Sequence, residues 1–143
     1  MKMRVLLADD HTLMRAGLRS LLEDHPRIEV IAEAKNGRDA VALAEELKPN
    51  IVIMDVSMPE LNGIEATRQV LAKGSDVKVI ALSIHSDRRF VDGMFAAGAS
   101  GYLLKDCALE ELVRAIETVT DGKLYLSPGV AGGVIITARR NLL

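Results

Sequence analysis

Five short apolar runs divide the first 122 residues of the chain at regular intervals. They cover residues 4–8, 28–34, 51–55, 77–83 and 101–104. Between them, apolar residues recur at helical spacing within 14–22, 40–47, 64–71, 90–97 and 109–116. Short apolar runs bounded by turn residues are typical of buried strands, and a period near 3.6 is typical of amphipathic helices. The pattern therefore predicts five strands, each followed by a helix.

Strict alternation of strands and helices with short connections indicates a parallel sheet. We predict an α/β fold in which helices cover both faces of a doubly wound, five-stranded parallel sheet. The run at 51–55 has no polar position before its last residue, which indicates a central strand buried on both faces. We place the folded domain at residues 1–122 and interpret residues 123–143 as a linker or tail.

Composition narrows the class of protein further. The 143 residues fit one domain, and no apolar run approaches the ~18 residues that a membrane span needs. The single cysteine, Cys107, fits a reducing compartment and shows no zinc-ligand spacing with the three histidines, so we expect a cytoplasmic protein. Because 18 basic residues face 20 acidic ones, a nucleic-acid-binding surface is not indicated.

Asp55 ends the run at 51–55, and its position has two interpretations. An aspartate there can form a turn or cap a helix N-terminus. It can also be a reactive carboxylate at the rim of a parallel sheet, where α/β proteins bind their ligands. The segment alone does not decide between them.

Polar residues accompany the ends of three other predicted strands. Asp9 and Asp10 follow the first strand, Ser83 ends the fourth, and Lys105 follows the fifth. Taken singly, these residues have ordinary interpretations as a helix cap, a polar strand end and a solvated lysine. Because the carboxyl ends of parallel strands share one edge of the sheet, we expect these side chains to meet Asp55 there. We interpret the combination as a site.

Such a site is suited to phosphoryl chemistry. Carboxylate oxygens are the protein ligands that Mg²⁺ prefers, and clustered carboxylates repel each other unless a cation is present. Asp55 is then a candidate nucleophile toward a phosphoryl group. Lys105 can pair with a phosphoryl oxygen, and Ser83 can donate a hydrogen bond to another.

Across residues 3–122 the chain resembles the receiver domains of two-component response regulators. The resemblance implies a flavodoxin-like sheet with strand order 2-1-3-4-5 and makes Asp55 the phosphoacceptor for a sensor histidine kinase. It implies Mg²⁺ bound by Asp10, Asp55 and the backbone carbonyl of Ser57. Asp9 would act on the metal directly or through a water molecule. A receiver is a signalling domain that catalyses only its own phosphorylation and dephosphorylation, and is otherwise not an enzyme.

The resemblance also implies a switch. Lys105 takes the position of the phosphoryl-binding lysine, and Ser83 and Tyr102 take the positions of a switch pair, with the Tyr102 ring moving inward as Ser83 turns toward the phosphoryl group. Two positions depart from the usual pattern. Asp106 stands where many receivers have proline, so we expect a trans peptide bond before it. Ile84 stands where many have a small residue, which affects access to Asp55.

Finer motifs resemble the NarL/FixJ (LuxR-type) regulators. The motifs are Ala8-Asp9-Asp10-His11, Arg15-Ala16-Gly17-Leu18, Gly101-Tyr102-Leu103-Leu104-Lys105-Asp106 and Gly122-Lys123-Leu124-Tyr125-Leu126-Ser127-Pro128. That subfamily carries a C-terminal helix-turn-helix domain, for which this chain has too few residues. The resemblance implies transcription control, with DNA bound only through that missing domain, and a possible homodimer on phosphorylation.

Three alternatives stay open at this point. One is a stand-alone receiver that acts through protein–protein contacts. The second is a dehalogenase-type phosphatase, but such an enzyme needs a second aspartate two residues after the nucleophile, where this chain has Ser57. The third is a flavodoxin-like electron carrier, for which the chain has few aromatic residues, with two tyrosines, two phenylalanines and no tryptophan.

Overall fold

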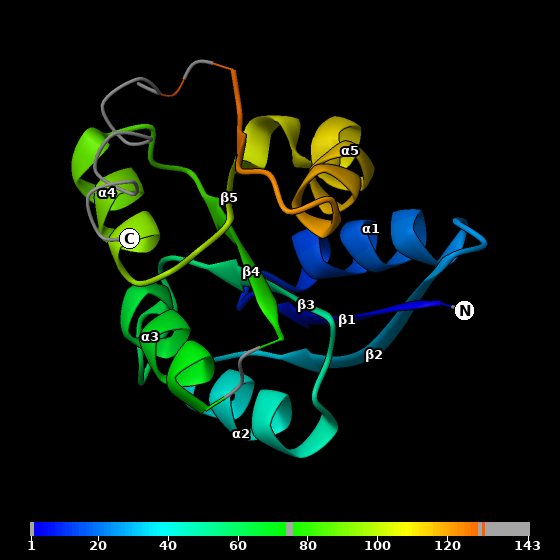
Figure 1. Ribbon diagram of the computed structural model, residues 1–143, viewed down its shortest axis with the longest axis horizontal. Coiled ribbons are helices and arrows are strands. Elements are labelled where there is room, and N and C mark those ends of the chain that lie inside the picture. The colour runs from blue at the N-terminus through cyan, green and yellow to red at the C-terminus, as the bar shows by residue number, and fades with distance from the viewer. Residues whose placement is uncertain (1, 74–75, 129, 131–143) are drawn as a thin grey trace.

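The computed structural model describes residues 2–73, 76–128 and 130, so most of the predicted tail lies outside the described residues. Strands and helices alternate along this part of the chain (Figure 1). The elements are β1 (Met3–Ala8), α1 (Thr12–Glu23), β2 (Ile28–Ala34), α2 (Gly37–Leu47), β3 (Ile51–Asp55), α3 (Gly63–Lys73), β4 (Lys78–Ser83), α4 (Arg88–Ala96), β5 (Gly101–Leu104), the 3₁₀ turn η1 (Lys105–Cys107), α5 (Ala108–Thr120) and β6 (Tyr125–Leu126).

The strands form one parallel sheet with the order β2-β1-β3-β4-β5-β6. The predicted order of the first five strands is confirmed. β3 lies inside the sheet, between β1 and β4, and all five of its residues are buried. The register sets Ala8 of β1 beside Met54 of β3, and Asp55 beside Leu82 of β4, so these strands end at the same edge.

Alternate residues of the strands point to two separate cores. Even-numbered positions of β1 and β3, such as Leu6 and Met54, pack with α2, α3 and α4, whereas odd-numbered positions, such as Leu7 and Ile53, pack with α1 and α5. Figure 1 shows α1 and α5 on one face of the sheet and α2 and α3 on the other. Because both faces are covered, the central strands are apolar between their ends, as the sequence pattern predicted.

A sixth strand corrects the prediction of five. Tyr125 and Leu126 pair in parallel with Gly101 and Tyr102 of β5, and the Tyr125 N–H donates to the Ser100 carbonyl at 3.0 Å. A two-residue strand contains too few positions to show any periodicity, which is why the sequence pattern did not reveal it. The sheet therefore continues past residue 122, where we placed the end of the folded domain.

Two local features fix the loop that follows β3. Gly63, the first residue of α3, lies so close to β3 that a Cβ atom on it would stand 2.0 Å from the Asp55 carbonyl oxygen. Its N–H donates to the Val56 carbonyl at 2.8 Å, which closes the loop beside Asp55. Every peptide bond in the described residues is trans, including the bond before Asp106, as expected. None of the described helices is long and apolar enough to span a membrane.

Candidate functional site

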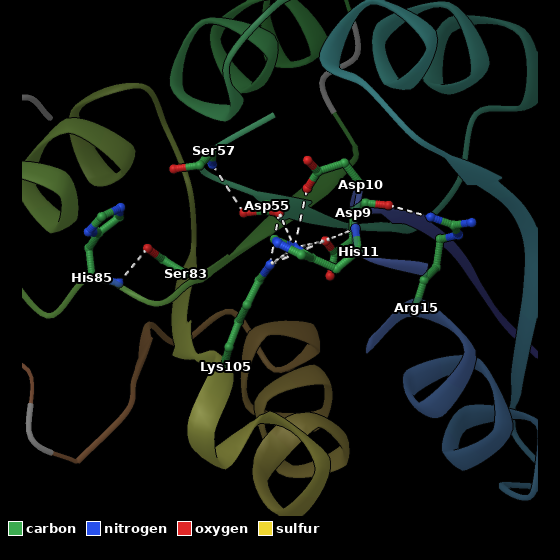
Figure 2. A network of polar contacts seen from close by, with 9 residues as sticks. All are labelled: Asp9, Asp10, His11, Arg15, Asp55, Ser57, Ser83, His85 and Lys105. Carbon is green, nitrogen blue, oxygen red and sulfur yellow. Dashed lines mark hydrogen bonds and ion pairs between the residues drawn. The ribbon is translucent and has the colours of Figure 1, made fainter. Parts of the chain in front are cut away.

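Polar side chains gather where β1, β3 and β5 end, as predicted. Asp9 follows β1, Asp55 is the last residue of β3, and Lys105 begins the turn after β5. All three are buried, with 1%, 2% and 8% of their surface exposed, whereas Asp10 is exposed. Figure 2 shows them converging with the ring of His11. We call this group the acidic pocket: Asp9, Asp10, His11, Asp55 and Lys105.

Lys105 holds the two buried carboxylates of the acidic pocket together. Its Nζ donates to Asp55 Oδ2 at 2.9 Å and to Asp9 Oδ1 at 3.2 Å. It also lies 2.7 Å from Nδ1 of His11. The pocket contains three carboxylates and one ammonium, so its described side chains carry an excess of negative charge.

The pKa values of the two buried carboxyls, Asp55 and Asp9, shift in opposite directions. Burial raises the pKa of Asp55, and the Asp9 carboxyl adds to the rise, so that it reaches about 7 against the opposing Lys105 ammonium and Ser57 N–H. Burial also acts to raise the pKa of Asp9, but hydrogen bonds from its neighbours and the charge of Lys105 lower it below its ordinary value. Two adjacent carboxyls that share one ammonium favour a single shared proton.

Donor atoms for a cation are available in the pocket. One ligand atom from each of Asp9, Asp10, His11 and Asp55 lies within 4.8 Å of the others. Asp9 Oδ2 is buried and has no hydrogen-bond partner among the described residues, which is costly unless another group approaches it. The residues present therefore fit a divalent cation.

Ser57 contacts the phosphoacceptor candidate through its backbone. Its N–H donates to Asp55 Oδ1 at 3.1 Å and so holds one carboxylate oxygen while Lys105 holds the other (Figure 2). The predicted role of its carbonyl as a metal ligand stays a prediction.

Ser83 and Tyr102 are joined through His85. Ser83 Oγ accepts the His85 N–H at 2.9 Å, and the Tyr102 hydroxyl donates to the His85 carbonyl at 2.7 Å. The Tyr102 ring is fully buried, and its expected movement on switching stays a prediction. Burial raises the pKa of the Tyr102 hydroxyl, which keeps it a donor. The His85 ring in turn stacks on Phe90 of α4, with centroids 4.1 Å apart.

Two contacts of His11 were not anticipated. The sequence indicated no metal-ligand spacing between the histidines and Cys107, yet the His11 N–H donates to Asp9 Oδ1 at 2.9 Å and its ring lies over the carboxylates. The sequence signal was its position directly after two aspartates at the end of a strand.

A second charged group supports Asp9 from the other side. Arg15 is 7% exposed, donates from Nη1 to the Asp9 carbonyl at 2.6 Å and from Nε to Glu33 Oε1 at 2.6 Å. Arg19 also bonds Glu33. We call Arg15, Arg19 and Glu33 the arginine cluster. Sequence reasoning noted Arg15 only as part of a subfamily motif and missed this supporting role.

A third polar group anchors β6. Ser127 Oγ accepts the Leu104 N–H at 3.0 Å and donates to Glu111 Oε1 at 3.0 Å. The Tyr125 hydroxyl donates to the same carboxylate oxygen at 2.5 Å. Burial and the Glu111 carboxylate raise the pKa of Tyr125 to about 12. The contact at Leu104 ties the chain after α5 to the residue that precedes Lys105.

Comparisons with known proteins agree with the geometry. Residues 5–117 match the family model of the response regulator receiver domain. The chain is 40% identical over 139 residues to the transcriptional regulatory protein DegU of Brevibacillus brevis, covering 97% of this chain and 59% of the relative. It is 42% identical over 128 residues to the response regulator GacA of Pseudomonas aeruginosa, covering 90% of this chain and 60% of the relative. The chain thus spans about three fifths of the length of these curated relatives.

Solved structures give the same result. A LuxR-family two-component response regulator from Aurantimonas sp. superposes with a TM-score of 0.85 at 35% identity, covering 99% of this chain and 98% of the other. The signal receiver domain of the putative response regulator NarL from Mycobacterium tuberculosis gives a TM-score of 0.81 at 30% identity, covering 85% of this chain and 98% of the other.

Proposed function

The chain belongs to the response regulator receiver family, and from this premise we propose that Asp55 accepts a phosphoryl group from a sensor histidine kinase in a Mg²⁺-dependent reaction. The observation that carries the proposal is the environment of Asp55. A carboxylate that is 2% exposed ends an internal strand, with one oxygen on a lysine ammonium and the other on a backbone N–H. Buried carboxyls with strongly shifted pKa values cluster at functional sites, and the pKa of Asp55 is raised to about 7.

The transfer step follows from these contacts. A carboxylate oxygen of Asp55 forms a bond to phosphorus while the bond between phosphorus and the donor nitrogen breaks, and the electron pair of that bond returns to the nitrogen. The Lys105 Nζ lies 2.9 Å from Asp55 Oδ2, so it can donate to a phosphoryl oxygen and stabilise the negative charge there. Ser83 can donate its hydroxyl proton to another phosphoryl oxygen. Asp10, Asp55 and the Ser57 carbonyl would hold Mg²⁺, with Asp9 beside them, and the bound ion would neutralise phosphoryl charge.

The output of the domain would be a changed surface. We propose that Ser83 leaves the His85 N–H for a phosphoryl oxygen, which frees the segment between β4 and α4 to rearrange. Because Tyr102 bonds the His85 carbonyl, the rearrangement would reach β5. Addition of beryllofluoride with Mg²⁺ should shift the NMR signals of residues 84–106. Shifts limited to residues around Asp55, with 84–106 silent, would contradict the switch.

The proposal extends to the longer proteins that this chain resembles. DegU is named a transcriptional regulatory protein, and the chain matches about three fifths of it. In such a longer regulator, phosphorylation of Asp55 would control DNA binding by another domain, through dimerisation or release of that domain. The single free cysteine among the described residues, Cys107, is consistent with the cytoplasmic location that this role requires.

Intact-mass spectrometry tests the assignment of Asp55. Incubation with acetyl phosphate and Mg²⁺ should add one phosphoryl group per chain, and chelation of Mg²⁺ should prevent the addition. Asp55→Asn should show no added mass, because the amide cannot act as the nucleophile. Asp87→Asn, which changes an aspartate at the N-terminus of α4, is the matched control and should be labelled normally. Undiminished labelling of Asp55→Asn would reject the site.

A further inference from the structure

The ring of His11 is placed to act as a metal ligand, although the chemistry proposed for the pocket needs only oxygen ligands. His11 is the residue before α1, with an extended backbone (φ −88°, ψ 104°). Its N–H is fixed to Asp9 Oδ1, so the backbone turns the side chain over the carboxylates (Figure 2). With 60% of the side chain exposed, the ring is not held there by burial in a core.

The spacing of the side-chain atoms matches a coordination shell. His11 Nδ1 lies 3.1 Å from Asp9 Oδ1, 3.3 Å from Asp10 Oδ1 and 3.7 Å from Asp55 Oδ2. Ligands about 2.0–2.2 Å from a metal ion are about 2.8–3.6 Å apart when they occupy adjacent corners of an octahedron or tetrahedron. The imidazole nitrogen therefore stands among the carboxylates at nearly the separations that a shared cation would impose. The unpartnered, buried Asp9 Oδ2 adds a further donor atom.

Nδ1 of His11 faces the pocket. Lys105 Nζ lies 2.7 Å from it, and a lysine ammonium can only donate, so in the tautomer protonated at Nε2 the Nδ1 lone pair accepts this contact. The same lone pair is the one that a metal ion would use. A cation bound to Nδ1 would therefore replace the ammonium as the partner of His11, while Lys105 keeps its contacts with Asp55 and Asp9.

From this geometry we infer that His11 Nδ1 ligates a divalent transition-metal ion together with Asp10 and Asp55. An imidazole nitrogen favours ions such as Ni²⁺ or Zn²⁺ over Mg²⁺, which prefers oxygen and loses its waters reluctantly. The pocket would then discriminate between two classes of cation, with the loss of the contact between Lys105 and His11 as a consequence of binding the nitrogen-preferring class. The inference rests on the proposed use of this pocket for a divalent cation and assigns it a further ligand and a selectivity.

Calorimetric titration of the purified chain with Ni²⁺ and, separately, with Mg²⁺ tests the selectivity. Ni²⁺ should bind at least tenfold more tightly than Mg²⁺. His11→Gln should weaken Ni²⁺ binding at least tenfold and change Mg²⁺ binding less than threefold. His25→Gln, which removes a histidine outside the pocket, is the matched control and should leave both unchanged. Equal loss for both ions, or no loss for Ni²⁺, in His11→Gln would overturn the inference.

A measurement on the unaltered chain keeps the test independent of the variant. Pulsed electron paramagnetic resonance of bound Mn²⁺ should show coupling to one nitrogen nucleus, and its absence would overturn the inference. Asp10→Ala separates this result from the proposed function, since it should weaken Mg²⁺ and Ni²⁺ alike. If Asp10→Ala weakens neither, the proposed cation site itself fails. If Asp10→Ala weakens both and His11→Gln weakens neither, only the role of His11 fails.

Discussion

The acidic pocket and the arginine cluster meet at Asp9. The pocket has more acidic than basic side chains, and the cluster has more basic than acidic ones. In the acidic pocket two buried carboxylates share one ammonium, whereas in the arginine cluster two guanidinium groups share the carboxylate of Glu33. Arg15 connects the two, because it bonds both Glu33 and the Asp9 carbonyl. The arginine cluster can therefore support the backbone from which the acidic pocket extends.

The pKa values of Glu33 in the cluster and Asp55 in the pocket shift in opposite directions. Burial acts to raise the pKa of Glu33, but hydrogen bonds from Arg19 and Arg15 outweigh it, and the pKa falls below its ordinary value. In the pocket the pKa of Asp55 rises to about 7. A carboxylate paired with two guanidinium groups keeps a lowered pKa, whereas buried carboxylates that outnumber their cations are receptive to a further cation.

The largest expected effect that separates the two regions is the pH dependence of stability without metal. Asp55 keeps its proton to a higher pH in the folded state than in the unfolded state, so the free energy of unfolding should fall as the pH rises from about 4 to about 7. A rise in the pKa from 3.8 to about 7 corresponds to at most about 4 kcal/mol. The lowered pKa of Asp9 has the opposite sign, but it changes stability only as the pH falls below its ordinary value of 3.8.

Urea unfolding in the presence of a chelator between pH 4.5 and 8 measures this dependence. Asp55→Asn should remove most of the slope. The contribution of Glu33 has the opposite sign, since its lowered pKa adds stability that is present above its unfolded pKa and is lost as the pH falls below it. Stability that rises from pH 5 to 7 in the unaltered chain would contradict the charge imbalance proposed for the pocket.

The next effect comes from removing the ammonium of the acidic pocket. Lys105→Gln leaves the buried carboxylates without their cation and should lower the free energy of unfolding by about 3 kcal/mol at pH 8 without metal. The loss should be smaller at pH 5, where Asp55 takes up a proton, and Mg²⁺ should restore part of it. Lys73→Gln is the matched control: its ion pair with Glu45 is exposed, so the change should stay below about 0.5 kcal/mol. An equal effect of the two substitutions would remove the distinction.

The smallest effect concerns the arginine cluster. Glu33→Gln leaves Arg15 without its anionic partner and should lower the free energy of unfolding by about 1 kcal/mol. Mg²⁺ should not restore this loss, because the cluster is not part of the metal site. Glu23→Gln changes only the exposed partner of Arg19 and should have a smaller effect in the same denaturation experiment. Rescue of Glu33→Gln by Mg²⁺ would mean that the two clusters act as one.

The sequence by itself determined the five principal strands, their order through a family resemblance, and the convergence of Asp9, Asp55 and Lys105. These features are encoded locally, because a buried strand needs a continuous apolar run, and parallel strands place whatever follows them at one edge of the sheet. Residue identities at strand ends were enough to predict that these three groups meet.

Only the tertiary structure decided the direction of side chains and the contacts of short segments. His11 lies over the pocket because its N–H is fixed to Asp9, and Arg15 is buried because β2 brings Glu33 beside it. The strand β6 exists because β5 and Glu111 offer partners to Tyr125 and Ser127. None of these contacts leaves a periodic pattern along the chain, since each depends on partners distant in sequence that meet only once the sheet has formed.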